Sequence, residues 1–286
     1  MEGTGFISSL IMLVTAMVTY RGFKDLKLFR DGIFRVDPIL KKAEYWRMLT
    51  SGLFHASWLH FGLNLAALLV FSDELEQLFG DGRFLMIFAL SLIGGNLFSL
   101  YRYRNQGDYQ AVGASGAISG LIFASIVLYP ESNITFFMLP YEVKAWTVGV
   151  FFVLVSTLLI KRQVGMIGHE AHIGGLITGV ILTAAIYPEV LIYNAWVVVT
   201  ILIPTMAFLI FIVKDPITWV RKKFAGKSVA GPMRDSSRRP RPSTAVSVAL
   251  DPETELNKLL DKIRAQGYQS LTYAEMARLQ SLREQL

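Results

Sequence analysis

Residues 191–213 read LIYNAWVVVTILIPTMAFLIFIV, a run of 23 positions without a charged side chain. A helix needs about 20 apolar residues to cross the ~30 Å hydrocarbon layer of a bilayer. We therefore expect a membrane helix here, kinked at Pro204 in a way that membrane helices tolerate. Six earlier stretches have a similar apolar character, namely residues 4–20, 53–71, 84–100, 115–129, 145–160 and 170–187.

The composition indicates the same class of protein. Hydrophobic residues make up 53% of the 286 residues and charged residues only 17%, against about a quarter in soluble domains. The chain contains no cysteine, which excludes disulfides, zinc thiolates and cysteine nucleophiles. Its N-terminal stretch lacks a basic start and a small-residue cleavage site, so the first span is expected to stay uncleaved. The predicted fold class is all-α, a polytopic membrane helical bundle of seven spans.

The chain changes character after residue 213. Residues 1–213, the predicted membrane domain, carry 14 basic and 14 acidic residues, whereas residues 214–286 carry 14 and 8. Residues 214–250 are rich in Ser, Pro and Arg, a composition that cannot bury a core, and are expected to form a basic linker. We expect this linker to bind anionic lipid of the bilayer, and we expect no nucleic-acid partner.

Residues 251–286 are predicted to form a small amphipathic helical hairpin. Asp251 is placed to cap the first helix, and Thr272 with Glu275 makes a capping box for the second. A solvated or self-associating tail and a regulatory element are both open interpretations of this hairpin.

Positive charge gathers on one side of the predicted bundle. With seven spans, the loops after the first, third and fifth share a side with the tail. Those loops hold most of the cations of the membrane domain, whereas the opposite side holds only Arg83 and Lys144. By the positive-inside rule, the cation-rich side is expected to be cytoplasmic.

All four histidines lie in or beside predicted spans, at His55, His60, His169 and His172. Imidazoles are costly inside a membrane and usually mark function. His60 and Asn64 are four residues apart, on one helical face, and both side chains can donate hydrogen bonds toward a common point. The alternative is that they only hold helices together through polar contacts.

Two of the predicted spans begin with a reactive side chain, Ser115 in one and His172 in the other. Each is followed by a pair of glycines four residues apart, and small residues at this spacing let helix backbones approach closely. These helices can therefore bring the serine and the histidine into contact.

The length of the fourth span indicates the depth of Ser115. From Ser115 to Tyr129 the helix is about 22 Å long, shorter than the ~30 Å layer, so the serine is expected in a water-filled cavity below the surface. The first N–H groups of a helix are unpaired and favour negative charge. A hydroxyl, a base and oxyanion donors are the groups that hydrolysis requires.

Other catalytic motifs do not fit. GASGA at 113–117 lacks the final glycine of G-x-S-x-G, and HEAH at 169–172 spaces its histidines three apart, unlike the H-E-x-x-H of zinc proteases. We expect neither a metal nor a cofactor.

Four motifs together resemble the rhomboid family of intramembrane serine proteases, namely YWR at 45–47, HASWLHFGLN at 55–64, GASG at 113–116 and AHIGGLITG at 171–179. Their order, spacing and placement match over about residues 40–187. The resemblance implies a six-helix core within residues 1–187, with 191–213 as an added seventh helix. It also implies a serine endopeptidase acting on transmembrane protein substrates, in the cell or inner membrane if the source is bacterial.

The resemblance further implies roles for individual residues. Ser115 would be the nucleophile and His172 the general base, in a dyad without an acidic third member. The oxyanion would be held by the backbone N–H of Ser115 and the side chains of His60 and Asn64.

Other parts of the chain also match family features. Trp46 and Arg47 would be structural. Residues 161–168 would form a flexible cap over the site, and the fifth span would lie where substrate enters.

Ser119 departs from the family pattern, in which many members carry an aromatic ring at this position that packs on the histidine. The orientation of His172 must then come from another residue.

Bacterial members generally open the site to the outside, which disagrees with the charge distribution described above. Two alternatives are an inactive rhomboid-like protein that binds membrane clients, and a transporter with Glu170 as the acidic residue within its spans.

Overall fold

The computed structural model describes residues 5–135, 142–160, 168–214 and 252–266, together with positions 275, 278, 279 and 282. The chain divides into two compact units, Met1–Lys223 and Phe224–Leu286, which are described separately. The predicted linker lies outside the described residues apart from Lys214, and so do residues 161–167 of the predicted cap.

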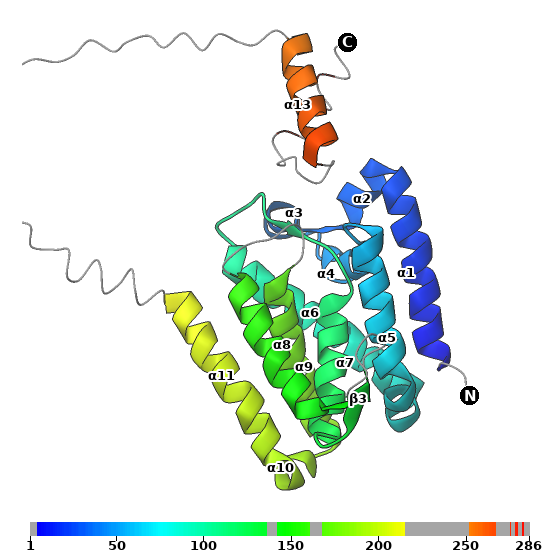
Figure 1. Cartoon of the computed structure of the whole chain (residues 1–286), viewed down its shortest axis with the longest axis vertical. Coiled ribbons are helices and arrows are strands. Elements are labelled where there is room, and N and C mark those ends of the chain that lie inside the picture. The colour runs from blue at the N-terminus through cyan, green and yellow to red at the C-terminus, as the bar shows by residue number, and fades with distance from the viewer. Residues whose placement is uncertain are drawn as a thin grey trace, which may run out of the picture. The chain divides into compact units, whose positions relative to one another are not determined.

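Each of the seven stretches predicted to span the membrane is helical in the structure (Figure 1). The helices are α1 (Phe6–Lys24), α5 (Trp58–Phe79), α6 (Asp81–Tyr103), α7 (Ser115–Leu128), α8 (Ala145–Ile160), α9 (His169–Ile186) and α11 (Ala195–Lys214). The predicted all-α polytopic bundle is thereby confirmed.

Among the described residues, three helices are long and apolar enough to cross a membrane by themselves, namely α1, α6 and α9. A fourth span forms if α5 is joined to the preceding Arg47–Leu53, from which it bends by 96°. The shorter apolar helices comprise Ser115–Leu128, Ala145–Thr157 and Ala195–Ala207.

The second span begins later than the expected residue 53. Residues Ser51–Leu53 form the short 3-10 helix η1, and α5 starts at Trp58. The side chain of Ser57 caps α5 by accepting a hydrogen bond from the backbone N–H of His60 at 3.1 Å. At the other end, α5 stops at Gly80, whose φ of +73° favours glycine. Capping chemistry therefore sets both ends of this helix, rather than hydropathy.

The connection between α1 and α5 folds into short elements instead of an open loop. These are α2 (Leu26–Gly32), β1 (Phe34–Arg35), α3 (Val36–Lys42) and α4 (Arg47–Thr50). Strand β1 pairs antiparallel with β2 (Gln110–Ala111), which ties the first loop to the chain leading into α7. A second small pair joins β3 (Asn133–Thr135) to β4 (Glu142–Lys144).

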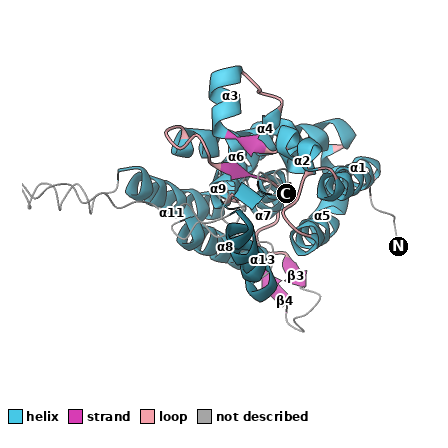
Figure 2. Cartoon of the chain, turned by 90° about the horizontal axis from the view of Figure 1, so that it is seen from above, coloured by secondary structure: helices cyan, strands magenta, loops and turns pink. Residues whose placement is uncertain are grey.

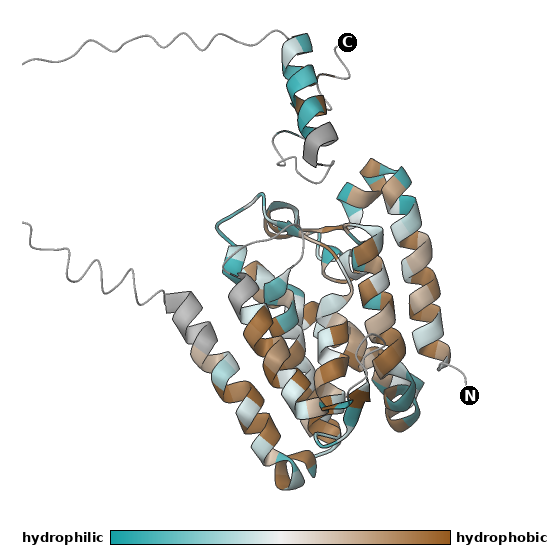
Figure 3. Ribbon diagram, in the orientation of Figure 1, coloured by the Kyte–Doolittle hydropathy of each residue, from teal (hydrophilic) through white to brown (hydrophobic). Residues whose placement is uncertain are grey.

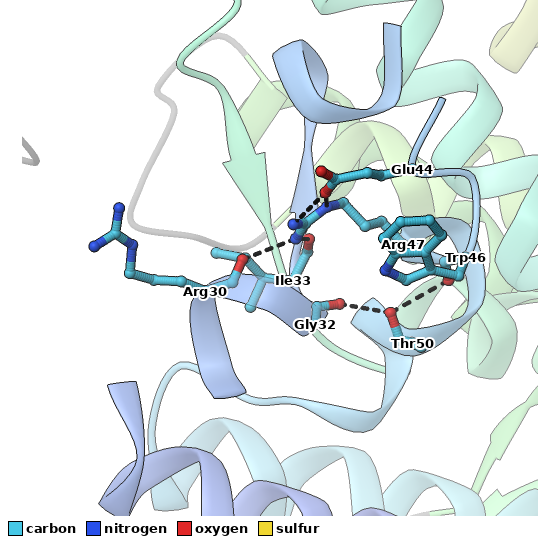
Figure 4. A network of polar contacts seen from close by, with 7 residues as sticks. All are labelled: Arg30, Gly32, Ile33, Glu44, Trp46, Arg47 and Thr50. Carbon is cyan, nitrogen blue, oxygen red and sulfur yellow. Dashed lines mark hydrogen bonds and ion pairs between the residues drawn. The ribbon is translucent and has the colours of Figure 1, made fainter. Parts of the chain in front are cut away.

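Arg47 holds this first loop together (Figure 4). Its guanidinium is buried, donates to the carbonyls of Arg30 at 2.8 Å and Ile33 at 2.9 Å, and pairs with Glu44. A buried cation is tolerated when its donors are satisfied in this way. Trp46, its neighbour in the same motif, is exposed.

Helix α7 lies at the centre of the bundle, surrounded by the other helices (Figure 2), and most of its residues are buried. Its contact with α9 is made backbone to backbone. A Cβ at Gly175 would lie 2.0 Å from the Gly116 carbonyl oxygen, and one at Gly179 would lie 2.3 Å from that of Gly120. No side chain fits at either position, so the close approach depends on glycine.

The helices of the bundle consist mainly of apolar residues, as the brown parts of the ribbon in Figure 3 show, and the outer helices expose many large apolar side chains. Helix α1 is the clearest case. Its buried positions include Ser8, Thr15 and Thr19, whereas Phe6 and Leu13 are exposed. Small polar groups facing inward and apolar groups facing outward are the pattern expected for a helix in contact with lipid.

The N-terminus of α1 is capped from another helix. Glu76 of α5 is buried, and its carboxylate accepts the backbone N–H groups of Ile7 at 2.6 Å and Ser8 at 2.8 Å. A carboxylate at this place satisfies unpaired donors and complements the helix dipole.

The second unit contains α13 (Pro252–Gln266). Its Leu259 is buried together with Leu282, and two ion pairs join the same parts of the chain, Lys262 with Glu275 and Arg278 with Glu255. Asp251, Thr272 and most of the predicted second helix lie outside the described residues.

Candidate active site

Ser115 is the first residue of α7, and the chain entering it is fixed by Gly113. The Gly113 backbone has φ +119° and donates to the Ser51 carbonyl at 3.0 Å. A Cβ on Gly113 would lie 2.9 Å from Nε2 of His60 and 3.7 Å from Oγ of Ser115. Only glycine suits this conformation and this space, and its presence lets the His60 ring approach the serine.

The structure brings Ser115 and His172 together. His172 Nε2 lies 2.8 Å from Ser115 Oγ, and the two residues come from the first turns of α7 and α9. A neutral imidazole can accept the serine proton at this distance. The geometry is that of a hydroxyl hydrogen-bonded to a base, and the catalytic roles of the two residues remain a prediction.

The His172 ring is held by aromatic neighbours from two helices. The ring of Phe152 on α8 lies 5.7 Å away, tilted by 41°, and His169 meets it edge-on at 5.4 Å. The hydroxyl of Ser119 donates to the Ser115 carbonyl at 2.7 Å. In the family that the sequence resembles, a residue of α7 at position 119 often packs on the histidine ring. In this structure Phe152 of α8 and His169 of α9 itself make that contact.

His60 presents a free N–H beside the serine. Its Nδ1 accepts from the Ala56 backbone at 3.4 Å, which places the ring proton on Nε2. This nitrogen is buried and has no hydrogen-bond partner among the described residues. Next to Ser115, it is a suitable donor for an oxyanion.

Asn64 lies one turn further along α5 and is also buried. Its Nδ2 donates to the His60 carbonyl at 2.8 Å, so one amide hydrogen is engaged within its own helix. The second amide hydrogen remains available, and the predicted oxyanion role of Asn64 stays a prediction.

The four histidines form two edge-on pairs, His55 with His60 and His169 with His172. His55 contacts His60 edge-on at 5.0 Å, and its Nδ1 lies 3.0 Å from the hydroxyl of Thr19 on α1. Because that hydroxyl also donates to the Leu53 carbonyl, it accepts from His55. This histidine supports His60 and links α1 to the site.

A small polar cavity lies beside the serine, large enough for about one water molecule. Its lining includes Ser51, Asn96, Gly113 and Ser115. The Asn96 side chain donates to Ser51 Oγ at 3.0 Å and to the Met48 carbonyl at 2.8 Å. Water can thus be held next to the Ser115 hydroxyl.

Sequence reasoning missed two residues around the site. Asn96 carried a usable signal, since an amide within an apolar span requires partners. Phe152 carried little signal, because α8 is mostly apolar and hydropathy does not separate the phenylalanine at 152 from its neighbour Phe151.

Comparison with known proteins places these features in a family. The sequence model of the Rhomboid domain matches residues 42–189, just over half of the chain. The chain is 32% identical over 158 residues to the putative rhomboid protease YdcA of Bacillus subtilis, covering 54% of this chain and 74% of YdcA. It is 29% identical over 150 residues to the rhomboid protease GluP of the same organism, covering 52% of this chain and 28% of GluP.

A eukaryotic relative matches the same region. The chain is 30% identical over 139 residues to the mitochondrial rhomboid protein 1 of Saccharomyces cerevisiae, covering 47% of this chain. The match spans only 40% of the yeast protein, so like GluP this relative has much that the chain does not share.

Proposed function

This chain belongs to the rhomboid family, and from that premise we propose that it is an intramembrane serine endopeptidase using a Ser115–His172 dyad. It would hydrolyse peptide bonds in or near transmembrane segments of membrane proteins. The observation that carries the proposal is the 2.8 Å contact between Ser115 Oγ and His172 Nε2 at the start of a central buried helix.

In the first half-reaction, His172 takes the Ser115 proton as the serine oxygen attacks the scissile carbonyl carbon. The carbonyl becomes a tetrahedral oxyanion. His172 then gives its proton to the leaving amine, the C–N bond breaks, and the acyl group stays on Ser115.

In the second half-reaction, a water molecule replaces the amine. His172 removes its proton as it attacks the acyl carbon, and the ester bond to Ser115 breaks with return of the proton to the serine oxygen. The polar cavity beside Ser115 can hold this water next to the acyl group.

The oxyanion is served by donors from two helices. The backbone N–H of Ser115 opens α7, where the first N–H groups lack intrahelical partners and the helix dipole favours negative charge. The His60 Nε2–H supplies a second donor, and Asn64 a third once its free amide hydrogen is turned to the site. One such donor typically contributes about 10²- to 10³-fold in kcat.

The substrate must offer an accessible peptide carbonyl. A transmembrane helix engages its carbonyls in its own hydrogen bonds, so a substrate segment has to unwind locally before attack. We expect small or helix-weakening residues near the cleaved bond.

The test uses purified protein with a fluorogenic single-span substrate. Ser115→Ala and His172→Ala should each abolish cleavage, whereas Ser125→Ala, a serine-to-alanine change ten residues along α7, should leave it near the wild-type rate. Wild-type protein should also be labelled at Ser115 by a fluorophosphonate probe. Retained cleavage in either dyad variant removes the dyad, and a wild-type chain that neither cleaves nor reacts is an inactive client-binding relative.

A further inference from the structure

Glu170 is a buried carboxyl group that the proposed reaction does not use. It lies in the first turn of α9, two residues before His172, and is only 3% exposed. Its Oε1 accepts from the hydroxyl of Tyr103, and its Oε2 lies 3.5 Å from the hydroxyl of Tyr109. A buried carboxyl needs such partners.

The two tyrosines connect Glu170 to the rest of the site. Tyr103 ends α6, and its ring stacks on that of Tyr109 with centroids 3.7 Å apart and planes 14° from parallel. Tyr109 directly precedes β2, and its carbonyl accepts from Val36 beside β1 at 3.2 Å. The chain then runs from β2 through Gly113 to Ser115. Through these two tyrosines, the carboxyl group of Glu170 therefore connects α9, which carries His172, with the end of α6 and with the segment that leads to Ser115.

Burial and the neighbouring Glu170 raise the pKa of Tyr109 above its ordinary value. The phenol therefore stays protonated and remains a donor. The contacts of Glu170 are directional, since each hydroxyl has to point at a carboxyl oxygen.

The rest of the α9 interface with α7 and α6 is apolar. It combines glycines packed against backbone, at Gly174, Gly175 and Gly179, with the buried side chains of Ile173 and Leu176. Such contacts allow close approach of the helices but are less directional than hydrogen bonds. A shift of about 1 Å in a catalytic group can cost about a hundredfold in rate.

We infer that Glu170 is a positioning residue, which fixes the first turn of α9 through Tyr103 and Tyr109 and thereby holds His172 within reach of Ser115. The expected effect of Glu170 on the cleavage rate rests on the proposed function, whereas its effect on the position of the first turn of α9 concerns the fold alone. A kinetic measurement and a thiol-oxidation measurement separate the two effects.

The kinetic experiment compares kcat and KM for cleavage of the single-span substrate. Glu170→Ala should lower kcat roughly ten- to a hundredfold with KM nearly unchanged, because the base is displaced but substrate binding is not. Glu170→Gln keeps a carbonyl acceptor and should recover part of that loss. Tyr101→Phe, a tyrosine of the same helix that is 52% exposed, is the matched control and should behave as wild type.

The second experiment needs no activity. The chain has no cysteine, so Gly168→Cys combined with Ala111→Cys introduces the only two thiols. A Cβ on Gly168 lies 3.4 Å from that of Ala111, close to the separation that a disulfide requires. The rate of disulfide formation under mild oxidation, measured by the loss of maleimide mass-tagging, reports how firmly the start of α9 is held against β2, the strand that leads to α7. Adding Glu170→Ala should slow the reaction several-fold, and Tyr101→Phe should not.

An unchanged oxidation rate in a folded Glu170→Ala chain overturns the positioning role, whether or not the wild type is a protease. If Glu170→Ala does not fold, as judged by thermal unfolding, the same comparison is made with Glu170→Gln and Tyr109→Phe. A wild-type chain without cleavage removes the proposed function and leaves the oxidation result to decide the positioning role.

Discussion

The His172 ring is packed between His169 and Phe152, and in the proposed dyad this packing takes the place of an acidic third member. An isolated imidazole on a first helical turn can rotate about its side-chain bonds, and only some orientations direct Nε2 at Ser115. Phe152 also meets Phe123 of α7 edge-on at 5.6 Å, so the ring that packs on His172 is itself in contact with the helix that carries Ser115. The orientation of the proposed base is therefore expected to depend on α8, the helix where the resemblance predicts substrate entry.

Phe152→Ala should therefore lower kcat up to about tenfold, since an aromatic contact contributes about 0.5–1.5 kcal/mol beyond area burial. Phe151→Ala is the matched control, because Phe151 precedes it on α8 but is 67% exposed. The measurement is the rate of single-span substrate cleavage together with the rate of fluorophosphonate labelling. Equal effects of the two substitutions would show that Phe152 acts only as apolar bulk.

At the scale of elements, two helix ends are completed by side chains from elsewhere in the bundle. Glu76 of α5 caps the N-terminus of α1, and Asn194 donates to the Val127 and Leu128 carbonyls at the C-terminus of α7, at 2.9 and 3.1 Å. Water is scarce at membrane depth, so unpaired N–H and C=O groups at these ends need protein partners. These contacts fix how far each helix extends and how it sits against its neighbour.

Glu76→Gln should destabilise the protein by about 2 kcal/mol, because a charged acceptor of two buried backbone donors is replaced by a neutral amide. Glu74→Gln, on the same helix but exposed, provides the control with the same change of charge. Equilibrium unfolding in mixed micelles measures the difference. Equal stability of the two variants would mean that α1 is held by its apolar contacts alone.

At the scale of the molecule, the protein is a multi-pass membrane bundle in which the seventh helix is part of the packed core. Val197, Val198 and Ile201 of α11 are buried with residues of α7 and α9, and Trp196 packs edge-on against Trp146 of α8 at 6.0 Å. Helix α11 therefore supports α8 from outside, and through α8 the ring of Phe152. The six-helix core is not structurally independent of the added helix.

A chain ending at residue 187 should accordingly unfold at a lower temperature than one ending at 223, which retains α11. The shorter chain loses the buried face of α11 and also the Asn194 donors, and leaving buried carbonyls unpaired costs about 1–3 kcal/mol. Asn194→Ala in the longer chain isolates the second effect and should be the milder change. Thermal unfolding in detergent compares the three, and equal midpoints for the two truncations would contradict the packing role of α11.

The sequence by itself determined the class of fold, the approximate positions of the seven helices, and Ser115, His172, His60 and Asn64 as candidates for one site. Each of these predictions rests on a signal that can be read from a short stretch of sequence. The signals are the length of an apolar segment, polar residues that are costly within such a segment, and glycines spaced for close approach of helices. The family resemblance rested on the same residues.

Tertiary structure alone decided that α5 begins at Trp58, that Phe152 packs on the His172 ring, and that Glu170 contacts Tyr103 and Tyr109. These features depend on which faces of different helices meet. The sequence of a span that is apolar on all sides does not indicate which face packs against the neighbouring helices. Hydropathy fixes that a segment enters the membrane, whereas packing between helices fixes its rotation, and the contacts around the site follow from rotation.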